Sequence, residues 1–381
     1  MALRDDLHAH AARFRAAKRP ADVFGPLNGP DLAARLQRLG EIYRALALEM
    51  HPDRYVHSAE LGDLATELFV QLSGWRDEAE RQLRRVAAGG GHFFEVRGTR
   101  FAVLTTLPGG DVCDVFTVCN PEEPASEPLV LKVATDPANN DLLDNEVQAL
   151  HRLWSAPQLE IDVFGRYLPR LLAGATLPDG RRANLLSLAD GYVTLAQVQA
   201  AYPKGVDGRT ISWMGNRVLE LLAWVHRCGV VHGAVTPDHV LVHPVTHGCT
   251  LVDWCYAVCD WRYPDGPHLA AVPKSSRQRY PDEVFQRAAA SPRLDLFLAA
   301  GTLGQTAGID LWNFKRPLAM ANPLDPPIAE SMAEVLRGCR LPRLPDRFAD
   351  AFEVYERWRQ AQLRAFGPRK YHPFSLPVAG A

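Results

Sequence analysis

Two stretches near the N-terminus have the hydrophobic spacing of amphipathic helices. In the first, apolar side chains recur at steps of four and three residues, namely Leu32, Leu36, Leu39, Tyr43, Leu46 and Met50. The second begins at the favourable N-cap Ser58 and repeats the spacing with Leu61, Leu64, Leu68, Leu72 and Trp75. Because Pro52 in the short connection cannot continue a helix, the pattern predicts a hairpin of two antiparallel helices.

The pattern changes at a run of three glycines, residues 89–91. The chain before it is helical in pattern, with an interruption rich in Pro and Gly at 19–30. After it, the sequence predicts strands at 93–107, 112–119 and 129–134, then helices from 140 onward with short strands at 185–188, 239–242 and 250–253. We therefore expect an α+β protein with a small all-α domain at 1–90, a larger domain at 91–366 and a mobile tail at 367–381.

Composition and charge narrow the classes of partner. The 381 residues carry 42 Lys and Arg against 44 Asp and Glu, for a net charge of -2, so no overall positive field favours nucleic acid. The seven cysteines include no Cys-x-x-Cys pair, which favours a reducing compartment. The charged N-terminus and the absence of a long apolar run argue against secretion and membrane spanning. The sequence therefore predicts a cytoplasmic protein that binds neither nucleic acid nor membrane.

The connection between the two predicted helices reads His51-Pro52-Asp53-Arg54, and with residues 43–50 it resembles the J domain of DnaJ-type co-chaperones. The resemblance implies that His51, Pro52 and Asp53 are presented to a DnaK-type chaperone. It also implies a steering role for the basic residues around them, Arg35, Arg38, Arg44 and Arg54. A solvated basic face with a Pro-containing turn is the alternative. The helix that packs on the hairpin in a J domain could be 2–17 or a short turn near 22–27.

The larger domain resembles protein kinases in five matches that occur in the kinase order. The first is a lysine, Lys132, on a predicted strand and a glutamate, Glu146, on the helix that follows, with Gly109 and Gly110 upstream between two strands. The other four are the segments 230–242, 250–255, 280–283 and 295–297. Over 95–300 the resemblance implies a bilobal fold, with lobes at 91–188 and 189–366.

The resemblance also assigns roles to these residues. Gly109, Gly110, Lys132, Glu146 and Asp253 would hold ATP, with Asp253 binding Mg²⁺ if ATP is bound. Asp295 would hold the backbone of the catalytic loop. The alternative is that Lys132 and Glu146 form only a buried salt bridge and that Asp253 caps a turn.

The catalytic loop departs from the kinase pattern. His232 is kept, but Ala234 replaces the Asp that accepts the proton of the substrate hydroxyl, and Thr236 replaces the Lys. His239 replaces the Asn that binds a second Mg²⁺, and imidazole nitrogen is a poor ligand for that hard ion. The sequence therefore predicts no catalytic residue set and an inactive pseudokinase.

We expect a co-chaperone scaffold that recruits a DnaK-type chaperone, holds an unidentified protein client, and binds ATP and Mg²⁺ without phosphotransfer or no cofactor at all. An atypical Ser/Thr protein kinase with Asp238 as its base is the first alternative. An assembly adaptor that binds no chaperone is the second. Four histidines, His232, His239, His243 and His247, do not predict a metal site, because a four-residue step does not converge on loops and strands.

Overall fold

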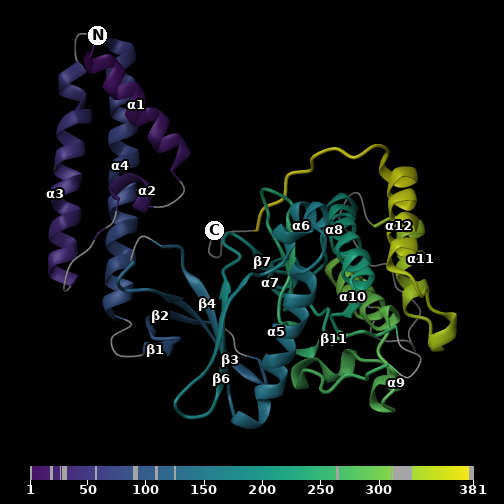
Figure 1. Cartoon of the computed structure of the whole chain (residues 1–381). Coiled ribbons are helices and arrows are strands. Elements are labelled where there is room, and N and C mark those ends of the chain that lie inside the picture. Colours follow the sequence, from purple (N-terminus) through teal and green to yellow (C-terminus); the bar gives the residue numbers. More distant parts are fainter. Residues whose placement is uncertain are drawn as a thin grey trace. The chain divides into compact units, whose positions relative to one another are not determined.

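A computed structural model describes most of the chain (Figure 1): residues 2–17, 20–25, 27, 32–55, 58–88, 93–107, 110–123, 126–262, 266–309, 311 and 328–376. It divides into two compact units. The first unit comprises Met1–Gly109 and Asp114–Lys132, and the second comprises Gly110–Cys113 and Val133–Ala381. The boundary expected at residue 90 lies inside the first unit, because the fourth helix contacts the second strand there.

Helices make up the first part of the first unit (Figure 1): α1 (Ala2–Ala16), α2 (Pro20–Phe24), α3 (Leu32–Met50), the 3-10 turn η1 (Pro52–Tyr55) and α4 (Ala59–Ala88). The apolar stripes predicted from the spacing meet, since Leu39, Leu46 and Met50 of α3 are buried with Leu68 and Leu72 of α4. The predicted helical hairpin is therefore present. Both candidates for the additional helix also pack on α4, because α1 and α2 each contact it.

The strands of the first unit are β1 (Phe93–Val96), β2 (Thr99–Leu107), β3 (Cys113–Cys119) and β4 (Leu129–Ala134). β1 and β2 pair antiparallel around a turn at Arg97 and Gly98, both of which have positive φ. β2 pairs antiparallel with β3, with a register shift between Val103 and Thr105, and β4 follows β3 in the strand order. All lie within the predicted strand regions.

In the second unit, β6 (Arg182–Ser187) pairs antiparallel with β5 (Leu171–Thr176). Helix α5 (Asn140–Trp154) packs on β5 and β6. Two small antiparallel sheets follow, one of β7 (Val193–Thr194), β9 (Val240–Val242) and β10 (Cys249–Leu251), the other of β8 (Val230–Val231) and β11 (Val258–Cys259). The remaining α-helices are α6 (Gln158–Phe164), α7 (Leu195–Ala201), α8 (Gly208–Arg227), α9 (Asp282–Phe285), α10 (Pro292–Thr306), α11 (Glu330–Cys339) and α12 (Ala351–Phe366).

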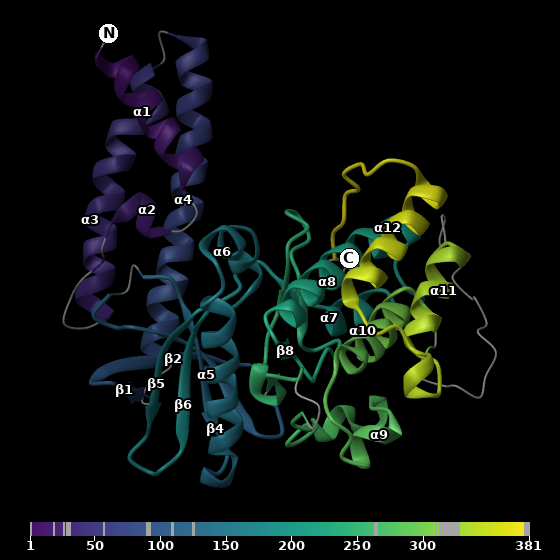
Figure 2. The same ribbon diagram turned by 45° about the vertical axis from the view of Figure 1, so that its right-hand side comes forward.

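The core of the second unit forms around α10, which is buried along almost its whole length. Helices α8 and α12 lie side by side (Figure 2), and the indole of Trp358 rests directly on Gly215. A Cβ atom at Gly215 would lie 2.4 Å from that ring, so the close approach requires glycine. Among the described residues, no helix has both the length and the apolar character needed to cross a membrane.

Residues of the tail predicted at 367–381 contact other parts of the second unit. Tyr371 donates to the carbonyl of Val245 at 3.3 Å, and Nε2 of His372 lies 3.2 Å from a carboxylate oxygen of Asp207. Residues 367–376 therefore make specific contacts with the second unit, which are contacts between distant parts of the chain that local composition does not reveal. Residues 377–381 lie outside the described part.

Candidate functional site

The carboxylate of Asp295 on α10 organises the loop that contains residues 232–239. Asp295 is 0% exposed, and its Oδ1 accepts a hydrogen bond from the amide of Gly233 at 2.8 Å. Its Oδ2 accepts from the amide of His232 at 2.7 Å and lies 2.8 Å from Nε2 of His226. Asp295 thus holds the loop backbone, as the resemblance implied.

Gly233 could not carry a side chain in this loop. It has φ of 77°, and a Cβ atom there would lie 2.4 Å from the carbonyl oxygen of Tyr256. An arginine at this position, as in the kinase pattern, would clash with that carbonyl. The local backbone therefore requires glycine at this position.

His232 is an uncharged structural residue. Burial lowers the pKa of His232 to about 4, although the nearby carboxylates of Asp295 and Asp253 oppose the shift. Its Nε2 donates to the carbonyl of Val252 at 3.1 Å, and its Nδ1 accepts from the amide of Ala234 at 3.2 Å. One neutral tautomer satisfies both contacts, so His232 braces the loop and exchanges no proton near pH 7.

Ala234 and Thr236, at two loop positions expected to take part in phosphotransfer, supply no catalytic group. Ala234 is fully buried and ends in a methyl group, so it cannot accept a proton. Thr236 is also buried, and among the described residues its hydroxyl has no hydrogen-bond partner. Asp238, the nearest carboxylate in the loop, is exposed.

His239 occupies the space beside the carboxylate of Asp253. Its Nε2 lies 3.1 Å from Oδ2 of Asp253, and its Nδ1 lies 3.0 Å from the carbonyl oxygen of Ala234. Both neighbours are hydrogen-bond acceptors, so the imidazole ring of His239 occupies one side of the Asp253 carboxylate. The sequence identified both residues but not their contact.

Asp253 has φ of 65° and ψ of 65°, the left-handed conformation, and its side chain makes no capping hydrogen bond to the turn that follows. The interpretation of Asp253 as a capping residue is therefore wrong. A non-glycine residue in this conformation is uncommon, and such strain concentrates at positions that the surrounding structure constrains.

Glu146 of α5 is buried within a polar contact network. One carboxylate oxygen accepts from Nδ2 of Asn184 at 3.0 Å, and the other accepts from the amide of Trp254 at 3.3 Å. Lys132 on β4, in the first unit, is 4% exposed. Sequence reasoning missed Asn184, although a lone amide side chain in the apolar run 183–186 was a detectable signal.

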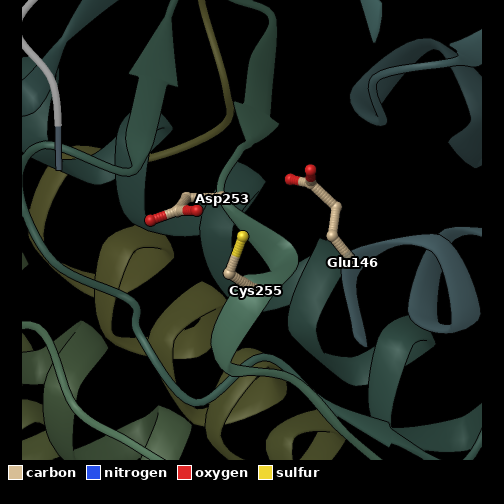
Figure 3. A group of neighbouring side chains, drawn as sticks. All are labelled: Glu146, Asp253 and Cys255. Atoms are coloured by element: carbon tan, nitrogen blue, oxygen red, sulfur yellow. The ribbon is translucent and has the colours of Figure 1, made fainter. Parts of the chain in front are cut away.

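Three side chains of the second unit approach one another as metal ligands could (Figure 3). Potential ligand atoms of Glu146, Asp253 and Cys255 all lie within 4.8 Å of one another, with the sulfur of Cys255 between the two carboxylates. Mg²⁺ prefers oxygen ligands, so the thiol does not suit it. Both carboxylates also accept hydrogen bonds from within the chain, so this group fits a packed polar core better than a magnesium site.

The predicted glycine loop is used for a turn. Gly109 lies outside the described residues. The amide of Gly110 donates to the carbonyl of Cys113 at 3.1 Å, so it is not directed at a ligand. The neighbouring Asp111, which sequence reasoning did not single out, accepts from the amide of Ser275 at 3.2 Å and from that of Lys274.

In the first unit, the loop 51–54 is exposed at the end of the helical hairpin. The side chains of His51 and Asp53 are 46% and 86% exposed, and Pro52 is half-buried. Arg54 donates to the carbonyl of Leu48 at 3.0 Å and so stabilises the C-terminus of α3. The loop therefore presents one carboxylate and one imidazole to solvent.

The basic residues proposed around this loop differ in their availability. Arg38 and Arg44 are exposed on α3, where Arg38 lies 3.5 Å from Glu41 and Arg44 bonds its own helix backbone at Gly40. Arg35 is half-buried and donates to the carbonyl of Pro121 at 3.0 Å. Arg35 therefore holds the helix against the strand region, while Arg38 and Arg44 face solvent.

Comparison with known proteins identifies the fold. No protein-family model matches the sequence, and no curated protein matches it. The kinase domain of PknI from Mycobacterium tuberculosis has a similar structure, with 18% identity and a TM-score of 0.48 over 70% of this chain and 97% of that one. The kinase domain of BubR1 is similar with 13% identity and a TM-score of 0.52, over 72% of this chain and 83% of that one. The chain therefore has a protein-kinase-like fold.

Proposed function

We propose that this chain is a pseudokinase scaffold whose helical head recruits a DnaK-type chaperone to a protein client bound by the kinase-like body. One observation carries the assignment of the body, the pairing of His239 with Asp253 at 3.1 Å. The carboxylate on which metal-dependent phosphotransfer would depend is already contacted by a side chain of the protein itself. The kinase-like fold suits a scaffold, and the contact between His239 and Asp253 argues against phosphotransfer.

Loss of the proton acceptor supports the same proposal. General-base catalysis contributes about 10² to 10⁴ in rate, and Ala234 removes it. No described side chain replaces it at that position, since His232 is neutral and occupied at both nitrogens. Asp238 is the only carboxylate of the described loop 232–239, and it is exposed, which leaves an atypical kinase as the second candidate.

Mg²⁺ fits these residues poorly. To reach Asp253, the ion would have to displace the imidazole ring of His239, and it would gain a nitrogen ligand or none. ATP is the ligand that the resemblance assigns to Lys132, Glu146 and Asp253. We propose that ATP acts only as a conformational ligand, with the ring of His239 beside Asp253 where a metal would bind.

The first test is phosphate transfer. We expect full-length protein incubated with radiolabelled ATP and an unfolded acceptor protein to transfer no more label than the variants Lys132→Ala and Asp253→Ala, because the base is missing. An active protein kinase assayed in parallel confirms that transfer is detectable. Label that disappears in both variants and in Asp238→Asn would instead establish the atypical kinase.

The second test is thermal stability with ATP. At 100 times its dissociation constant a ligand adds about 2.7 kcal/mol to the stability of the folded state. We expect ATP in the presence of EDTA to raise the melting temperature as much as Mg-ATP does, because His239 already occupies the side of Asp253 that a metal would need. The variant His239→Asn should need Mg²⁺ for the same shift.

The matched control is His243→Asn, which changes a histidine of the same segment whose ring contacts the amides of Val245 and Thr246 and the ring of Tyr192. A shift in the unaltered protein that requires Mg²⁺ would contradict the proposed role of His239. If ATP raises the melting temperature neither with EDTA nor with Mg²⁺, the protein is a scaffold that binds no nucleotide.

The proposed role of the head depends on the exposed loop 51–54. Asp53 is 86% exposed and makes no hydrogen bond through its carboxylate among the described residues, so it is available to a partner. A chaperone with basic groups opposite Asp53 and acidic groups opposite Arg38 and Arg44 would complement this surface. If no chaperone binds, the chain is an assembly adaptor.

A further inference from the structure

A cavity of about 530 Å³ lies in the second unit, and its lining includes neither Asp253 nor any residue of the loop 232–239. Its walls come from α8, the turn before β10, the end of α12 and the segment 367–372. Its volume is within the range of small-molecule binding sites. The C-terminal segment that builds its outer wall is held by the contacts of Tyr371 and His372.

The charge of the lining is strongly one-sided. Four permanent cations face the cavity, Arg209, Arg217, Arg369 and Lys370, and none of its lining residues is acidic. The whole chain, in contrast, has a net charge of -2. The positive charge is therefore concentrated at this place.

The four cations are only partly used within the protein. Arg217 lies 3.4 Å from Glu220, and Arg369 donates to the side-chain oxygen of Asn216 at 2.9 Å. Within the described part of the chain, the guanidinium of Arg209 and the ammonium of Lys370 have no hydrogen bond or ion pair, although Arg209 lies over the ring of Phe366. At least two cationic groups are thus free to bind an anion.

One wall is a rigid stack of three rings. The ring of His247 is parallel to that of Trp213, with centroids 4.1 Å apart, and on its other side it faces Tyr371 at 4.7 Å. The indole nitrogen of Trp213 and Nε2 of His247 are buried and have no partner among the described residues. Burial and then the positive charges of Arg217 and His372 lower the pKa of His247, which is consistent with a positive potential in this wall.

We infer that this cavity binds a small molecule or ion that carries a diphosphate group. A phosphate carries about 1.5 to 2 negative charges near pH 7, so a diphosphate matches the charges of Arg209, Lys370 and Arg369, whereas the charge of Arg217 is offset by Glu220. The planar guanidinium groups of Arg209 and Arg369 can each bind two phosphate oxygens, which favours this kind of anion.

Calorimetric titration of the full-length protein with inorganic pyrophosphate tests this inference. Pyrophosphate should bind the unaltered protein, and the double variant Arg209→Gln, Lys370→Gln should weaken binding about tenfold or more, because two charge-assisted contacts are lost. Both residues are exposed, and unchanged thermal melting of the variant would show that it is folded.

The matched control is the double variant Arg357→Gln, Arg359→Gln, which removes the same charge from the exposed face of α12 and should bind as tightly as the unaltered protein. Equal weakening by both double variants, or no binding at all, would overturn the inference. Lys132→Ala should not affect pyrophosphate binding, so the result is independent of the proposed ATP site.

A parallel titration with ADP in the Lys132→Ala protein distinguishes the source of the diphosphate. If ADP binds more tightly than pyrophosphate and this binding is lost in the double variant of Arg209 and Lys370, the ligand is a diphosphate ester. If ADP binds more weakly than pyrophosphate and both depend on these two residues, the ligand is the inorganic anion. If ADP binding is unchanged in the double variant and pyrophosphate does not bind, the proposed site is wrong.

Discussion

Replacing Asp295 by alanine is expected to lower the free energy of unfolding of the second unit by about 3 to 5 kcal/mol. The substitution leaves two backbone amides, those of His232 and Gly233, and Nε2 of His226 without the buried acceptor that they share. Each buried donor left without a partner costs about 1 to 3 kcal/mol. Urea denaturation followed by tryptophan fluorescence measures the change.

Two further variants separate the carboxylate from the shape of the side chain. Asp295→Asn keeps the shape but only one accepting oxygen, so its loss should be smaller than that of Asp295→Ala. Asp238→Ala removes an exposed carboxylate near the same loop and should change stability by no more than about 0.5 kcal/mol. A loss below about 1 kcal/mol for Asp295→Ala would show that the three donors find other acceptors.

The variant Asp53→Asn is expected to fail to stimulate the ATPase of a DnaK-type chaperone at concentrations at which the unaltered protein stimulates it. The side chain is 86% exposed, so the substitution should leave the head folded while it removes the charge offered to the partner. Loss of one charge-assisted contact corresponds to about 1.5 to 3 kcal/mol, or at least about a tenfold loss of affinity. Steady-state ATP hydrolysis by the chaperone, titrated with the full-length protein, measures it.

Asp63→Asn is the matched control, because it neutralises another exposed carboxylate on α4 outside the loop. It should stimulate as the unaltered protein does. If Asp53→Asn also stimulates normally, the loop is not the chaperone contact. If the unaltered protein fails to stimulate and does not bind the chaperone, the adaptor alternative takes the place of the co-chaperone.

The local sequence was sufficient for most of the elements. The steps of four and three residues predicted α3 and α4, and the predicted strands at 93–107, 112–119 and 129–134 correspond to β1 through β4. Such periodicity is a property of neighbouring residues, so it survives in the folded chain. The kinase-like order of motifs also predicted the fold that the BubR1 comparison supports.

Other features had no counterpart in the sequence analysis. The boundary at residue 90 and the mobile tail were inferred from composition and stay predictions, whereas the bonds from Arg35 to Pro121 and from Tyr371 to Val245 join distant parts of the chain. A lone amide in an apolar run marked Asn184 locally, but nothing local marked its partner Glu146, 38 positions away. Contacts over such separations leave no local pattern to read.

By itself, the sequence determined the α+β class, the helical hairpin with its exposed loop, and the loss of a proton acceptor at Ala234, because each depends on residue type or on near neighbours. Only the tertiary structure decided that His239 contacts Asp253 and that Arg209 and Lys370 line one cavity. Charges at these positions acquire a role only when folding removes water and brings them within hydrogen-bond or Coulomb distance of groups far along the chain.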